Sequence, residues 1–118
     1  MTEAAAAPTV RAEQFFALDV RVGRVLECRA LAQARQPAYR MVIDFGALGT
    51  RTSSARVTDN YSADQLVDSL VVAVVNLPPR QVGPVRSEVL VLGAYQDGGT
   101  TVALLRPDGE CAPGDRVG

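Results

Sequence analysis

The connections between the β-rich segments of this chain are too short to contain repeated crossover helices. Strands are predicted where β-branched and aromatic residues gather between turn residues, at 20–26, 39–45, 51–57, 71–75 and 89–94. Parallel strands would need connections of about a dozen residues or more, which are usually helical. The chain of 118 residues is therefore expected to fold as one all-β domain with antiparallel strands.

Local signals refine this expectation into a barrel. Ser62 and Gln65 match an S-x-x-Q capping box, which predicts a helix of about two turns between the third and fourth strands. A short N-terminal helix is predicted at 11–18, where apolar residues follow helical spacing. Gly23, inside the first strand, predicts a bulge or bend, as a small closed barrel requires. The expected fold class is a five-stranded antiparallel OB-fold barrel (the oligonucleotide/oligosaccharide-binding type) with these two short helices.

The remaining segments predict loops, turns and a tail. Prolines and a glycine at 77–83 predict a fixed, exposed loop, and the turn residues at 97–99 predict a hairpin. The nearly all-valine run at 71–75 predicts a strand that is buried on both faces. Residues 1–10 are expected to form a flexible tail, and residues 11–118 a single domain.

The residue types that are missing restrict the chemistry. The sequence contains no His, which is the commonest general base and the commonest metal ligand. It also contains no Lys, so neither a Schiff-base lysine nor a phosphate-loop lysine is available. Cys28 and Cys111 form no CxxC motif, which excludes a zinc ribbon and a thioredoxin-type redox site. The protein is therefore expected not to be an enzyme and to use no cofactor and no metal.

The cysteines and the hydropathy pattern predict a cytoplasmic protein. Two free, partly buried thiols are expected in a reducing cytosol, and a disulfide between Cys28 and Cys111 stays open as the alternative. The N-terminus lacks the basic start and apolar run of a signal peptide. The apolar runs are far shorter than the roughly 20 residues that span a bilayer, so no membrane insertion is expected.

Charge is concentrated in the first half of the predicted barrel. Residues 20–56 contain seven arginines and only two acidic residues, Glu27 and Asp44. This segment therefore has a net charge of +5, whereas the whole chain has a net charge of -1. The second and third strands are where an OB barrel holds nucleic acid. The acidic pI of about 5.3 and the scarcity of aromatic residues (5%) predict that such binding is modest and salt-sensitive.

Three stretches of the sequence resemble one known family. They are residues 18–46, 52–66 and 71–94, which contain D-x-R-V-G, A-R-x-P-A-Y, I-D-F-G, S-S-A, V-N-x-P-P-R-Q and S-E-V-L. Together they resemble the CsaA family of secretion-related chaperones, in the tRNA-binding-domain superfamily that includes the C-terminal appendix of methionyl-tRNA synthetases. The resemblance implies an OB fold, a homodimer, binding of unfolded or precursor proteins in the Sec export route, and binding of tRNA.

The motif positions also give candidate site residues. The resemblance places tRNA contacts at Arg35, Tyr39, Arg40, Ser53, Ser54, Asn76, Arg80, Arg86 and Ser87. Arginine suits this role because its guanidinium can hold a phosphate bidentately. The candidates for peptide binding are apolar residues near the expected dimer seam: Phe16, Leu77, Val82 and Val85. Phe15 and Leu18 are expected in the dimer interface, because a small barrel with apolar terminal surface can bury it against a second copy.

Two functions remain open at this point. The first is an ATP-independent, export-related chaperone that binds unfolded or precursor proteins as a homodimer and also binds tRNA. The alternative is a tRNA-binding accessory module of the methionyl-tRNA synthetase C-terminal type with no chaperone role.

Overall fold

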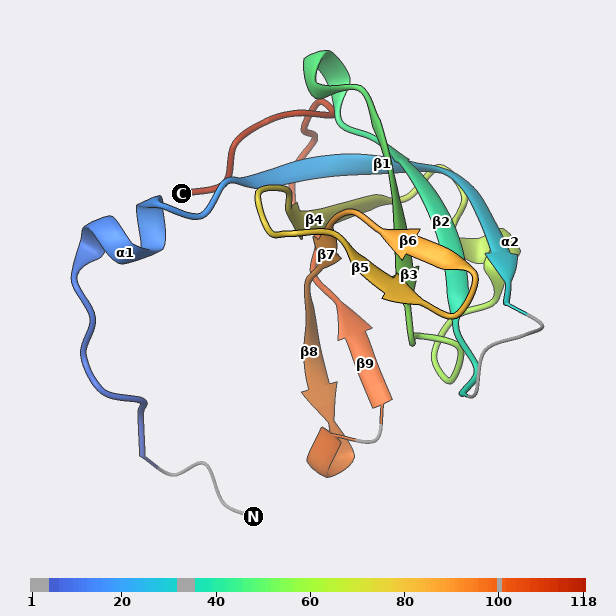
Figure 1. Ribbon diagram of the computed structural model, residues 1–118, viewed down its shortest axis with the longest axis horizontal. Coiled ribbons are helices and arrows are strands. Elements are labelled where there is room, and N and C mark those ends of the chain that lie inside the picture. Colours follow the sequence, from blue (N-terminus) through green and yellow to red (C-terminus); the bar gives the residue numbers. More distant parts are fainter. Residues whose placement is uncertain (1–4, 32–35, 100) are drawn as a thin grey trace.

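Five antiparallel strands form the barrel. The computed structural model describes residues 5–31, 36–99 and 101–118. The order of the five strands in the sheet is β3-β2-β1-β4-β7 (Figure 1). The bounds of these strands are β1 Val20–Ala30, β2 Tyr39–Asp44, β3 Thr50–Ala55, β4 Leu70–Val74 and β7 Leu90–Val91.

The two ends of this sheet meet. The backbone N–H of Glu88, just before β7, donates to the carbonyl of Thr52 on β3 at 2.8 Å. The hydroxyl of Ser53 donates to the carbonyl of Val89 at 3.2 Å. The chain on either side of these bonds therefore links β3 to the last strand, and the barrel is nearly closed. The prediction of a five-stranded antiparallel OB-type barrel is confirmed.

Short elements decorate the barrel. They are the helices α1 Ala12–Phe16 and α2 Ala63–Leu66, the hairpin strands β5 Arg80–Val82 and β6 Val85–Ser87, the second hairpin pair β8 Gly93–Gln96 and β9 Thr101–Leu104, and 3-10 turns at Gly46–Leu48 and Asp97–Gly99. The turn residues at 97–99 predict the hairpin of β8 and β9, and the pairing of these strands confirms it.

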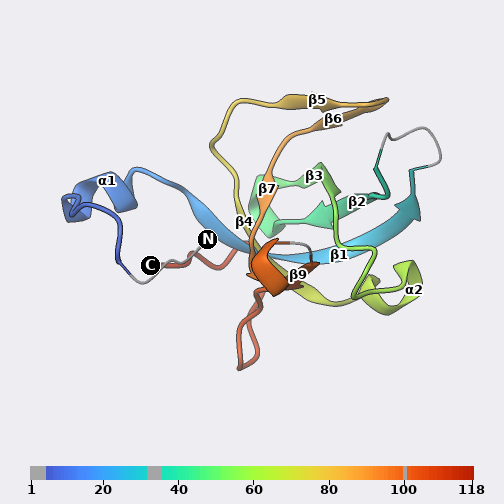
Figure 2. The ribbon, with the colours of Figure 1, turned by 90° about the horizontal axis from the view of Figure 1, so that it is seen from below.

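The prediction of a fixed, exposed loop at 77–83 is wrong in part, because β5 and β6 pair around a turn in which Gly83 has a φ of 55°. This hairpin lies against β3 (Figure 2).

The helix α2 begins at the predicted capping box. The hydroxyl of Ser62 accepts from the backbone N–H of Gln65 at 3.2 Å, and the Gln65 side chain accepts from the backbone N–H of Ser62 at 3.3 Å. The helix is one turn long rather than two. It ends because Val67 is already extended and Asp68 adopts a positive φ of 71°.

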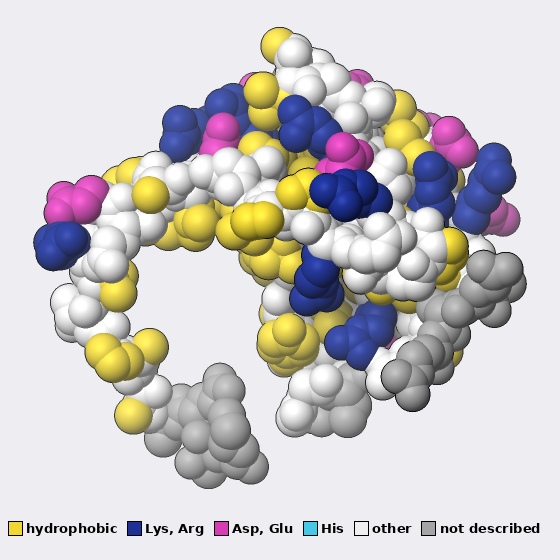
Figure 3. Space-filling view, viewed as in Figure 1, with side chains coloured by type: hydrophobic (Ala, Val, Ile, Leu, Met, Phe, Trp, Pro, Cys, Tyr) yellow, Lys and Arg dark blue, Asp and Glu magenta, His cyan; other side chains and the backbone are white. Residues whose placement is uncertain are grey.

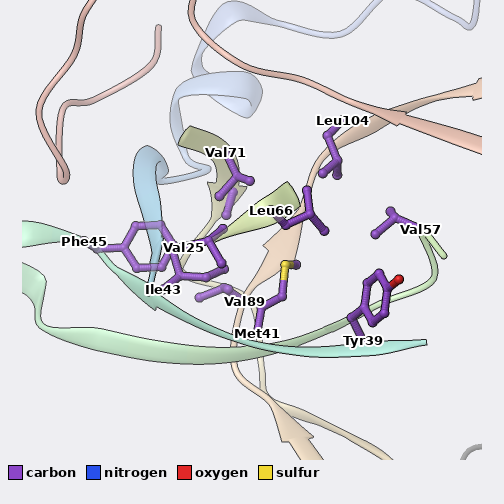
Figure 4. Close-up of a cluster of buried hydrophobic side chains, with 11 residues drawn as sticks. Val25, Tyr39, Met41, Ile43, Phe45, Val57, Leu66, Val71, Val89 and Leu104 are labelled. Carbon is purple, nitrogen blue, oxygen red and sulfur yellow. The ribbon is translucent and has the colours of Figure 1, made fainter. Parts of the chain in front are cut away.

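The core fills the barrel and continues through β4. Inside the barrel lie Met41, Ile43, Phe45, Leu66 and their neighbours (Figure 4). Strand β4 contributes Val71 and Ala73 to this cluster, whereas Val72 and Val74 pack with Val20 in a second cluster on its other face. The prediction that this strand is buried on both faces is confirmed.

Gly23 has a different role from the predicted one. The register shift in β1 falls between Val25 and Glu27, not at Gly23. A Cβ atom on Gly23 would lie 2.5 Å from Cγ2 of Ile43 and 2.7 Å from Cε1 of Phe45. Glycine is therefore required here because the core packs directly against the β1 backbone.

Replacing Gly23 by alanine is expected to destabilise the fold by about 1–3 kcal/mol, because the added methyl group overpacks the barrel. Urea denaturation followed by circular dichroism measures the change. Gly109→Ala is the matched control: no atom lies within 4 Å of its would-be Cβ. It should shift stability by no more than about 0.5 kcal/mol. Equal stability of the two variants would contradict this role of Gly23.

Candidate functional site

A row of arginine and serine side chains crosses the barrel and the β5–β6 hairpin. Arg40 on β2 lies opposite Ser54 on β3. The backbone N–H of Ser54 donates to the hydroxyl of Ser87 on β6 at 3.1 Å. Ser87 in turn lies opposite Arg80 on β5. These four residues, named here the arginine–serine row, are all candidates from the sequence, and the fold brings them together.

The cations of this region lack internal partners. Within the described ranges, the side chains of Arg40, Arg80 and Arg86 make no hydrogen bond and no ion pair. Arg86 is exposed next to Ser87, so strand alternation directs it to the other face of the hairpin. Dark blue arginine side chains gather over this side of the molecule (Figure 3). Unpaired guanidinium groups are suited to binding external anions such as phosphates. Arg35, the remaining arginine candidate, lies outside the described residues.

A small pocket adjoins the row. It has a volume of about 170 Å³ and is lined by Ser54, Leu77, Pro78, Arg80, Ser87, Glu88, Val89 and Leu90. Its lining combines two hydroxyl groups, the guanidinium of Arg80 and the carboxylate of Glu88 with an apolar wall. Leu77, a candidate for peptide contact, thus lies beside candidates for tRNA contact. The two predicted binding surfaces meet here.

Four predicted site residues have structural roles instead: Ser53, Tyr39, Val85 and Asn76. Ser53 is completely buried, and its bond to Val89 helps to close the barrel. Tyr39 is 8% exposed and its hydroxyl donates to the Tyr61 carbonyl at 2.7 Å, so its ring cannot serve as a stacking surface. Val85 is buried, which withdraws it from peptide contact, and Val82 opposite it is half-buried.

The fourth reassigned candidate is Asn76, which holds the start of β1. Its side-chain oxygen accepts from the backbone N–H of Asp19 at 2.8 Å, and its amide donates to the carbonyl of Ala17 at 2.9 Å. Asn76 therefore fixes the turn between α1 and β1 and is not part of the arginine–serine row. The V-N-x-P-P-R-Q motif thus has one residue that orients the chain and one, Arg80, in the row.

A second surface is an apolar groove beside α1. The groove has a volume of about 880 Å³ and is lined by Phe15, Leu18, Val20, Val22, Val72, Val74, Leu92, Leu105, Arg106, Pro107, Cys111, Asp115, Arg116 and Val117. Helix α1 has no buried residue, and Phe15 and Phe16 are 45% and 57% exposed. Residues 5–18, named here the N-terminal arm, stand away from the barrel and leave a wide hollow between them (Figures 1 and 3).

Polar bonds hold the base of the N-terminal arm. The Arg116 guanidinium donates to the carbonyls of Phe16 and Leu18 at 3.3 and 3.4 Å. Arg21 forms an ion pair with Asp19 at 2.6 Å, and this bond holds the pKa of the Asp19 carboxyl below its usual range. Among the predicted site residues that the structure describes, only Asn76 contributes a side-chain bond to this support. Its one sequence signal is the D-x-R spacing at the start of β1.

The two thiols are free, and burial raises the pKa of Cys28 to about 11. Within residues 5–31, 36–99 and 101–118, no group of three or more His, Cys, Asp or Glu side chains could hold a metal ion. No helix in the described part of the chain has the length and hydropathy to cross a membrane.

Known proteins resemble this chain over most of its length. The family described as "Putative tRNA binding domain" matches residues 20–116. The chaperone CsaA of Bacillus anthracis has a TM-score of 0.89 and 41% identity, with 94% of this chain and 100% of that chain covered. A CsaA chaperone protein of Picrophilus torridus has a TM-score of 0.85 and 41% identity, with 93% and 100% covered.

A curated relative is a much longer protein. A methionine–tRNA ligase of Porphyromonas gingivalis is 38% identical over 105 residues, which are 89% of this chain and 15% of the ligase. The chain therefore corresponds to a small part of that enzyme. On these matches the chain is a member of the tRNA-binding-domain family, and its resemblance to CsaA chaperones holds over almost its whole length.

Proposed function

We propose that the protein is an ATP-independent chaperone that acts as a homodimer, holds unfolded or precursor proteins in the cytoplasm for export by the Sec machinery, and binds tRNA. The observation that carries the homodimer in this proposal is the apolar groove of about 880 Å³ beside an arm whose own apolar side chains are exposed. A cleft of this volume with a mostly apolar lining is typical of a binding site. The similarity to proteins named as CsaA chaperones supports the same function.

A second copy suits the groove. The groove and the N-terminal arm lie on the same side of the molecule, so a twofold axis could place Phe15 and Leu18 of each copy against the other. Phe15 and Leu18 form one wall of the groove in their own protomer, and Asn76 and Arg116 hold the base of the arm so that the groove stays open. In the proposed dimer the face of β4 that carries Val72 and Val74 also becomes covered.

Client proteins are expected to contact apolar side chains that the dimer leaves free. Phe16 is exposed and does not line the groove, and Leu77 lies on the wall of the small pocket. Light scattering of a chemically denatured test protein, diluted with and without a molar excess of the purified protein, measures the activity. Suppression of aggregation without nucleotide supports the chaperone role, and Phe16→Ser should weaken it. No suppression at any excess would remove this half of the proposal.

The tRNA-binding role rests on the arginine–serine row. Replacing both Arg40 and Arg80 by glutamine should weaken tRNA binding by roughly tenfold or more, because charge-assisted hydrogen bonds to phosphates are lost. Fluorescence anisotropy at two salt concentrations provides the measurement, with the double variant Arg11→Gln, Arg24→Gln outside the row as the control for total charge. Unchanged binding by the Arg40→Gln, Arg80→Gln variant would show that tRNA binds elsewhere.

The alternative, an accessory module of the methionyl-tRNA synthetase type, is favoured by the ligase relative. It predicts tRNA binding by the row with no effect on aggregation. The light-scattering experiment therefore separates the two functions, because only the chaperone suppresses aggregation.

A further inference from the structure

We propose that Arg29 and Arg40 form a clamp in which two guanidinium groups hold one phosphate of bound RNA. This inference rests on the tRNA-binding half of the proposed function and extends the arginine–serine row by one strand. The two residues lie directly opposite each other in the antiparallel pair of β1 and β2. The neighbouring pair, Cys28 and Met41, packs on the core, so alternation directs both arginines outward.

Two like charges in this position weaken the fold. Directly opposite side chains have Cβ atoms about 4.5–5.5 Å apart, and like charges at that distance are destabilising. Arg40 has no carboxylate partner in the described ranges. Arg29 has one weak partner, Glu27 at 3.4 Å, and both of these side chains are largely exposed to solvent. A solvent-exposed pair of this kind contributes little, so the repulsion is not compensated within the described residues.

An external anion would compensate it. The cations and hydroxyl groups continue in series from Arg29 through Arg40, Ser54 and Ser87 to Arg80. Glu88 lines the pocket at the Arg80 end of this series, where its carboxylate accepts from the backbone N–H of Thr52 at 2.9 Å. With three arginines against this carboxylate and the exposed Glu27, the series keeps a net positive charge, which fits a ligand with repeated negative charges. The phosphate backbone of RNA is such a ligand, and arginine can grip it bidentately.

The neighbouring aromatic residues favour contact with the backbone over contact with bases. Tyr39 is buried, and the Tyr61 hydroxyl accepts from the backbone N–H of Leu104 at 2.9 Å. Neither ring is free to stack on a base, so binding near the clamp should depend little on sequence. Arg29 carries no motif signal and is revealed only by the strand register.

The test is a double-mutant cycle with Arg29→Gln, Arg40→Gln and the double variant. Binding to fluorescently labelled tRNA is measured by anisotropy over a range of salt concentrations. Each single variant should bind roughly tenfold more weakly. Because both side chains hold one phosphate, the double variant should lose less than the sum of the two effects. Its salt slope should fall by about 0.7–0.9, the value for one phosphate.

Two further measurements separate a clamp from a structural role. Without RNA, the single variants should unfold at an unchanged or higher urea concentration, since each removes the repulsion between the two arginines. Arg24→Gln is the control, because Arg24 also points outward from β1 but its guanidinium donates to the Asp68 carbonyl at 2.7 Å. Its tRNA affinity should match that of the wild type.

Each failure has its own meaning. If the wild type does not bind tRNA at low salt, the proposed function itself fails. If the wild type binds but the Arg29 and Arg40 variants keep its affinity and salt slope, the clamp is wrong and the function stands. If poly-glutamate displaces tRNA as well as an unlabelled RNA of equal charge does, the site selects acidic chains in general and the phosphate clamp is overturned.

Discussion

Replacing Phe15 and Leu18 by serine is expected to convert the proposed homodimer into a monomer. Both side chains line the groove of their own protomer. In the proposed dimer each protomer presents them to its partner, so a twofold interface would lose four apolar contacts at once. If each contact contributes about 1 kcal/mol, a modest part of the value for burying a Phe or Leu side chain, the total loss is about 4 kcal/mol. This corresponds to a dissociation constant roughly a thousandfold higher.

Sedimentation equilibrium over a range of protein concentrations measures this change directly. Leu26→Ser is the matched control, because Leu26 is also apolar and exposed on β1 but does not line the groove. The monomeric variant should unfold at nearly the same urea concentration as an isolated wild-type protomer, since neither side chain is buried in the barrel. A wild-type protein that sediments as a monomer at all concentrations would contradict the proposal, as would a dimer unaffected by both substitutions.

The barrel could be predicted from the sequence because its signals are local. The capping box at Ser62 and the valines of β4 define a helix start and a doubly buried strand without reference to the rest of the chain. The β5–β6 hairpin was missed because Pro78 and Pro79 dominate the pattern there, while the pairing depends on contact with β3. The sequence predicts a bend at Gly23 because it does not show which residues pack on this glycine. These residues are Ile43 in β2 and Phe45 directly after β2.

The candidate site was predicted in part, for a related reason. Motif positions single out polar residues, and the fold assembles four of them into the arginine–serine row, whose role in binding stays a prediction. A motif does not distinguish a side chain that faces a ligand from one that supports the backbone. Ser53 and Asn76 belong to the second kind, as their hydrogen bonds show. Arg29 required the register between β1 and β2, which no short motif encodes.

The two cysteines provide an independent test of the groove. Cys111 lines the groove, whereas Cys28 packs against the barrel core. In a dimer whose interface is the groove, alkylation of Cys111 should be slow and should accelerate severalfold in the Phe15→Ser, Leu18→Ser variant. Alkylation of Cys28 should be the same in both proteins, so it serves as the internal reference.

The pKa of Cys28 sets the behaviour of this reference. Burial raises it to about 11, so at pH 8 only about one thiol in a thousand is ionised, against roughly one in four for an ordinary cysteine. The higher nucleophilicity of a more basic thiolate offsets part of this difference, which leaves Cys28 roughly tenfold slower than an exposed thiol. Its rate should rise with pH up to about 11.

Mass spectrometry of iodoacetamide-treated protein, sampled over time, resolves the two sites. If Cys111 reacts at one rate in the wild type and in the monomeric variant, the groove is open in the dimer and the interface lies elsewhere.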